Sequence, residues 1–123
     1  MSVFGESEGH FRAIIEVYPC GSDTRKKPAF NGIRWAFAYA ADMNELGAGT
    51  APQSDVWPEF LDETGKSLAN EVPLIGEYSA IMHIVSDHMV DVHFQRLEEG
   101  TKFFCMEGRR KVARGRVTGL SMI

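Results

Sequence analysis

Apolar and polar residues alternate along several segments of the chain, and this period of two predicts β-strands. From Phe11 to Tyr18, every second residue is apolar until a proline and a glycine end the run. Between Ile33 and Tyr39, large apolar side chains share one face, and small or charged residues occupy the other. The pattern predicts six strands, at residues 11–18, 33–39, 78–85, 93–97, 102–106 and 112–120.

The strand at residues 102–106 carries apolar residues on both of its faces. We expect Phe103 and Cys105 to face the core, which leaves Phe104 and Met106 pointing outward. Such an outward pair either contacts a partner or belongs to the scattered apolar residues that most protein surfaces carry.

No segment shows the period of an amphipathic helix over ten or more residues, and residues 57–63 would form a short helical turn at most. Residues 42–72, rich in Gly, Ala, Pro and acids, are predicted to be a long inserted connection, of the kind that is often functional or mobile. We therefore expect an all-β chain, with an N-terminal extension at residues 1–9 and an antiparallel barrel at residues 10–123. A barrel is favoured because its closure leaves no exposed strand edge.

A length of 123 residues corresponds to one domain, and 44% hydrophobic residues suffice for a core. No apolar run is long enough to span a bilayer, and residues 1–8 lack the features of a signal peptide, so we expect a cytoplasmic protein without a membrane partner. Cys20 and Cys105 are expected to be reduced thiols, and their spacing is not that of a zinc site.

The net charge of −4 is distributed unevenly. Between Asp42 and Glu77, eight acidic residues accompany the single base Lys66. Basic residues gather at positions 25–27 and in the C-terminal part of the chain, at Lys102, Arg109, Arg110, Lys111, Arg114 and Arg116. This separation leaves room for an anion-binding surface on an acidic protein.

Two stretches resemble the C-terminal β-barrel domain of the translation factor EF-Tu. Residues 25–37 (RKKPAFNGIRWAF) are similar to its run of basic residue, Pro, Phe, Gly, aromatic, Arg and aromatic strand. Residues 98–118 (EEGTKFFCMEGRRKVARGRVT) are similar to its closing hairpin. The resemblance covers about residues 10–120 and implies a six-stranded barrel. The chain contains no glycine-rich phosphate loop, so we expect it neither to bind nor to hydrolyse GTP and to carry no cofactor.

The resemblance also implies an RNA site, because the factor's barrel contributes to binding the T-stem of tRNA. The matching positions are Arg25 and Lys26, and then Glu107 and Gly108, with Arg109 and Arg110 adding charge beside the second pair. A glutamine of the family falls on Ala36, so one polar contact is missing. A basic face that only aids solubility is the alternative interpretation.

Protein binding is the function that the sequence favours, with weak RNA or tRNA binding as the alternative. The acidic connection offers Trp57 and Phe60 as aromatic anchors for another protein. A small-ligand barrel or an enzyme ranks last, because no recognised arrangement pairs a nucleophilic Ser or Cys with a His. The ordinary interpretation of His83, His88 and His93 is that they lie on strand surfaces and in a loop, with a zinc site as the lesser alternative.

Overall fold

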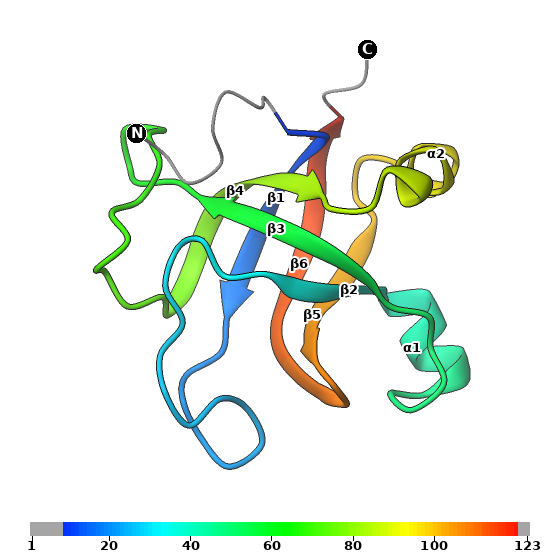
Figure 1. Cartoon of the computed structure of the whole chain (residues 1–123), viewed down its shortest axis with the longest axis horizontal. Helices are drawn as coiled ribbons and strands as arrows, with labels where there is room; N and C mark the ends of the chain where they lie inside the picture. Colours follow the sequence, from blue (N-terminus) through cyan, green and yellow to red (C-terminus); the bar gives the residue numbers. More distant parts are fainter. Residues whose placement is uncertain (1–8, 121–123) are drawn as a thin grey trace.

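The structure is a computed structural model that describes residues 9–120. Its elements in chain order are β1 (Phe11–Val17), β2 (Trp35–Tyr39), α1 (Ala40–Leu46), β3 (Ser54–Phe60), β4 (Gly76–Ile84), α2 (Asp87–Arg96), β5 (Lys102–Glu107) and β6 (Arg110–Leu120). The strands form a closed barrel in the order β1-β4-β3-β2-β5-β6, and every neighbouring pair is antiparallel (Figure 1). The predicted six-stranded antiparallel barrel is confirmed, with two short helices in addition. Of the expected N-terminal extension, only Gly9 lies within the described residues.

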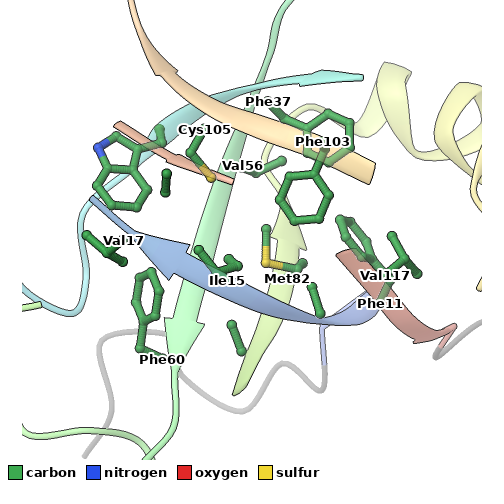
Figure 2. Packing of buried hydrophobic residues seen from close by; sticks show 14 of the residues in the cluster. Phe11, Ile15, Val17, Phe37, Val56, Phe60, Met82, Phe103, Cys105 and Val117 are labelled. Atoms are coloured by element: carbon green, nitrogen blue, oxygen red, sulfur yellow. The ribbon is translucent and has the colours of Figure 1, made fainter. Parts of the chain in front are cut away.

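The barrel interior is built from the inward side chains of the alternating segments. Figure 2 shows Phe11, Ile15 and Val17 from β1 pointing toward residues of the other strands, and all three are buried. The ring of Phe37 stacks on that of Phe103 with centroids 4.7 Å apart. The face assignments made for residues 11–18, 33–39 and 102–106 are thus confirmed for the inward positions.

Gly115 in β6 makes room for one of these rings. A Cβ atom at this position would lie 2.2 Å from Cζ of Phe103, closer than real Cβ contacts allow. Glycine therefore lets the Phe103 ring fill the interior where β5 and β6 pair.

The prediction of a long inserted connection at residues 42–72 is wrong, because these residues contain the end of α1 and the whole of β3. Strand β3 pairs with β4 from Val56 to Phe60 and so forms part of the barrel wall. Its acidic residues and Pro58 concealed a strand whose even-numbered positions Val56, Pro58 and Phe60 are all buried.

Pro58 is tolerated because β3 separates from β2 before reaching it. The β2–β3 pairing covers only Trp35↔Val56, Ala36↔Asp55 and Phe37↔Ser54. Further along, the side chain of Asn31 takes the place of the missing strand: its Oδ1 accepts the Phe60 N–H at 2.9 Å, and its Nδ2 donates to the Phe60 carbonyl at 3.1 Å. The N–H of Phe60 points to this side of β3, and the nitrogen of Pro58, two residues earlier, points the same way. Because proline has no N–H, no hydrogen-bond donor is left without a partner there.

The predicted strand at residues 93–97 is also wrong, because His93 to Arg96 are the last turn of α2. Met89, His93 and Leu97 recur every four residues, and Val90 and Phe94 lie beside them, which is the stripe of a helix packed on a core. The histidines and aspartates in this segment weakened the apolar period in the sequence.

Met106 is not exposed as expected, because helix α1 and the segment after it cover it. Phe104 and Met106 do point out of the barrel, but Met106 is only 1% exposed because it packs against Met43 and Ala51. This second, smaller apolar cluster lies outside the barrel wall. Neither of the two helices of residues 9–120 is long and apolar enough to cross a membrane.

Candidate basic surface

The two basic clusters of the sequence meet at one end of the barrel. The loop between β1 and β2 lies beside the turn between β5 and β6, as Figure 1 shows at the bottom of the view. Two contacts join them: the guanidinium of Arg25 forms an ion pair with Glu107, and Nη1 of Arg110 donates to the Thr24 carbonyl at 2.9 Å. We call the surface formed by residues 22–27 and 107–111 the basic end.

Glu107 holds the basic end to the barrel. Its Oε2 forms the ion pair with the guanidinium of Arg25 and also accepts a hydrogen bond from the indole Nε1 of Trp35 at 2.9 Å. Trp35 is buried in the core, so this carboxylate connects the core to the loop. Arg25 and Glu107 are therefore committed to each other and contribute little net charge to a ligand.

The hairpin turn between β5 and β6 is supported by residues of the α1–β3 connection. Gly108 has φ = +63°, a conformation that glycine adopts without strain, and its carbonyl accepts a hydrogen bond from Nε2 of Gln53 at 2.9 Å. The guanidinium of Arg109 lies against Gly49, where an added Cβ would be 3.3 Å from Cζ. The backbone of Gly108 thus has a partner within the chain, while the Arg109 side chain is exposed.

The basic end carries six basic side chains against two acidic ones. Five of the six bases are exposed, and only Arg25 is half-buried. A surface hollow of about 480 Å³ lies between the loop and the hairpin, and its lining residues are Tyr18, Ser22, Asp23, Thr24, Arg109, Arg110 and Lys111. Excess positive charge around a hollow favours the binding of an anionic ligand.

Comparison with models of protein families and with curated protein sequences gave no match to this chain. The six-stranded barrel is established.

The aromatic pair expected to anchor a partner protein is divided by the barrel wall. Phe60 is 0% exposed and packs in the core with Trp35 and Tyr78, so its assignment as an exposed anchor is wrong. Trp57 points outward and is half-buried, with its Nε1 donating to the Gly32 carbonyl at 2.8 Å and the Arg34 guanidinium 4.7 Å from its ring. Alternation along β3 explains this outcome, since positions 57 and 60 differ in parity.

A buried polar chain that the sequence did not reveal joins α2 to the barrel. His93, 2% exposed, contacts the Ser54 hydroxyl through Nε2 at 2.8 Å and the Tyr39 hydroxyl through Nδ1 at 2.6 Å. Burial and the charge of Arg96 lower the pKa of His93, and burial raises the pKa of Tyr39 to about 12. Arg96 completes the connection, with its guanidinium 3.8 Å from the Tyr39 ring and bonded to Asp42 in α1 at 2.7 and 2.8 Å.

This polar network brings a serine, Ser54, and a histidine, His93, together, which the sequence did not lead us to expect. The hollow at the basic end is lined by neither Ser54 nor His93. The three residues come from β2, β3 and α2, which are separated in the sequence, and no local motif signals their contact. The network fixes α2 to the barrel wall.

The other histidines do not form a metal site in the described part of the chain, where no group of three ligating side chains converges. His83 is buried and its Nε2 lies 3.2 Å from Oε1 of Glu59, so placing it on a strand surface is wrong. His88 is exposed near the start of α2. His10 Nδ1 accepts the Ile84 N–H at 2.9 Å, which ties the residue before β1 to the end of β4.

Proposed function

We propose that this protein is a non-catalytic RNA-binding module whose basic end binds the phosphate backbone of a structured RNA. The observation that carries the proposal is the convergence of residues 22–27 and 107–111, which places six bases on one surface of an acidic protein. The resemblance to the EF-Tu barrel makes tRNA the RNA of first choice, because the same two segments match the positions with which that factor contacts tRNA.

The physical basis is electrostatic. Each exposed Lys or Arg that neutralises a phosphate releases condensed counterions, so several bases together give an attraction that falls with salt concentration. Arginine also donates hydrogen bonds in a planar fork that suits phosphate. Lys26, Arg109 and Arg110 are exposed at the basic end and supply these groups.

The contacts within the chain change the roles expected from the resemblance. Arg25 and Glu107 pair with each other, and the Gly108 carbonyl accepts from Gln53, so these three shape the surface. Direct RNA contacts then fall mainly to Lys26, Arg109 and Arg110. Ala36 offers no polar group where the factor has glutamine.

The test is the salt dependence of tRNA binding, followed by fluorescence anisotropy. The double variant Lys26→Ala/Arg109→Ala removes two exposed bases, and we expect it to weaken binding on the order of tenfold and to flatten the salt slope by about one for each lost phosphate contact. The matched control, Arg12→Ala/Lys66→Ala, removes the same charge from exposed positions away from the basic end. Equal losses in both variants, or no salt-dependent binding of the unaltered protein, would contradict the proposal.

Protein binding through the outer barrel face is the second candidate. It is favoured by the half-buried Trp57 and by the exposed apolar residues Phe30 and Ile75, which lie next to the bridge between Ala29 and Leu74. In a lysate treated with nuclease, a partner retained by the unaltered protein and lost on Trp57→Ala would support it. Retention that survives Trp57→Ala would argue against this surface.

A further inference from the structure

A second hollow follows the outer face of β6 and begins where the basic end stops. It has a volume of about 360 Å³ and is open to solvent along the barrel wall. Its lining comes mainly from β1, β5 and β6 and includes Tyr18, Lys102, Phe104, Arg114 and Arg116. We call this hollow the β6 groove.

Two aromatic side chains flank β6, one from each neighbouring strand. Tyr18 directly follows β1, and its N–H donates to the Val112 carbonyl of β6 at 3.0 Å. Phe104 of β5 lies opposite Arg114 of β6 in the strand register. Both rings are half-buried, and Tyr18 lines the β6 groove and the hollow at the basic end alike. The two hollows therefore share a boundary at Tyr18.

Basic side chains continue along β6 from the basic end. Lys111 has its Nζ 4.1 Å from the centre of the Phe104 ring. Arg114 follows, with its Nε bonded to Glu16 at 2.6 Å, and Arg116 lies opposite Lys102 in the register. At about 3.3 Å per residue, Lys111 to Arg116 spans roughly 16 Å of strand. Bases outnumber acids along this path. Lys102, Arg114 and Arg116 line the groove, and the acids that line it are Glu16 and Glu77.

Alternating bases and aromatic rings suit an unpaired RNA strand better than a duplex. In a duplex the bases stack on one another, so aromatic side chains on a protein surface gain little from them. An unpaired strand presents phosphates to Lys and Arg and also base faces that stack on Tyr and Phe. The β6 groove supplies both kinds of contact within one path.

We infer that the β6 groove binds an unpaired segment of RNA that continues from the structured part held by the basic end. Tyr18 stacks on a base at the boundary between the two hollows, and Lys102 and Arg116 hold phosphates farther along the groove. The inference rests on the proposed RNA-binding function and specifies which form of RNA the protein prefers.

The experiment compares two fluorescent RNA probes of one sequence, a single strand of about 12 nucleotides and the same strand in a duplex. Loss of one stacking contact in Tyr18→Leu should weaken single-strand binding about tenfold and change duplex binding by less than about twofold. Tyr18→Phe keeps the ring and should bind the single strand within about twofold of the unaltered protein. Lys102→Gln/Arg116→Gln, which removes two exposed charges and no ring, should also weaken the single strand more than the duplex.

The outcomes separate this inference from the function on which it rests. Duplex binding with normal salt dependence but no preferential loss of single-strand binding in Tyr18→Leu and Lys102→Gln/Arg116→Gln would overturn the inference and leave the proposed function standing. Absence of binding to both probes and to tRNA would overturn both. A Tyr18→Phe variant as weak as Tyr18→Leu would show that the hydroxyl, and not stacking, provides the contact, and would overturn the inference as well.

Discussion

Two sides of this barrel are held together by different kinds of interaction. On the first, which we call the ladder side, β1, β6, β5 and β2 pair along most of their lengths through backbone hydrogen bonds. On the second, the β3 side, β2 and β3 pair at only three positions, and side chains then supply the missing partners. Asn31 serves the end of β3, and His93 joins its first residue, Ser54, to α2. The ladder side should therefore be sensitive to the volume of its core residues, and the β3 side to the loss or protonation of single polar groups.

The largest effect is expected from Trp35→Ala in β2, the strand at which the ladder side and the β3 side meet. Trp35 is 2% exposed, and its removal leaves a cavity and also takes a hydrogen bond from Glu107. The free energy of unfolding should fall by about 3 to 5 kcal/mol. Urea denaturation measures this, with Trp57→Ala as a control that removes a half-buried indole from the outer surface and should cost less. An unchanged unfolding midpoint in Trp35→Ala would refute the volume argument.

A smaller loss is expected from Asn31→Ala on the β3 side. The substitution removes little volume but leaves the buried Phe60 N–H without its acceptor. The Leu68 carbonyl loses the Asn31 donor, and the Phe60 carbonyl keeps only the Leu68 N–H at 2.8 Å. We expect a loss of about 1 to 3 kcal/mol and faster hydrogen exchange of the Phe60 amide. The exposed Asn70 provides the control, since Asn70→Ala should leave both quantities nearly unchanged. Continued protection of the Phe60 amide in Asn31→Ala would show that another group replaces the side chain.

The smallest effect, and the one most specific to the β3 side, is a dependence on pH. Burial and the charge of Arg96 lower the pKa of His93 from its ordinary value of 6.5, so the folded state favours the neutral ring held between Tyr39 and Ser54. Its stabilising contribution is fully present above about pH 6.5 and is lost as the pH falls through the lowered pKa. Between about pH 7.5 and about pH 5, the melting temperature of the unaltered protein should therefore fall more than that of His93→Gln.

His10 provides the background for that measurement. Its pKa is also lowered, by burial and then by His83, and it titrates in both proteins. His93→Gln should therefore retain part of the acid sensitivity. Identical falls in melting temperature would mean that His93 does not contribute to the pH dependence.

The same contrast explains which parts of the fold the sequence predicted. On the ladder side, the period of two is visible because backbone pairing demands only that large apolar residues occupy every second position, as in residues 11–17. Strand β3 was missed because Pro58 and Asp55 oppose a strand assignment, while the compensating partner, Asn31, lies 29 residues distant from Phe60. Helix α2 was missed because it packs through His93, which was counted as polar.

The candidate site shows the same limit at longer range. The basic residues were recognised from their local sequence, and their gathering at one end depends on contacts that no local pattern encodes. Arg25 and Glu107 are separated by 82 positions, and only the closed order of strands brings them together. The family resemblance implies RNA contact for both residues, whereas the structure pairs them with each other.

The pairing of β1 with β6 has a practical consequence for attaching the protein to a surface or a second domain. Phe11 and Leu120 are partners in the strand register, so the described chain enters and leaves the barrel at one rim. The basic end lies at the other rim, where β1 ends and β6 begins. A tether that joins the barrel at residue 9 or at residue 120 therefore starts at the rim opposite the basic end and leaves the basic end directed toward solution. A short linker between these two positions would permit circular permutation with new ends opened in an exposed loop such as residues 63–66.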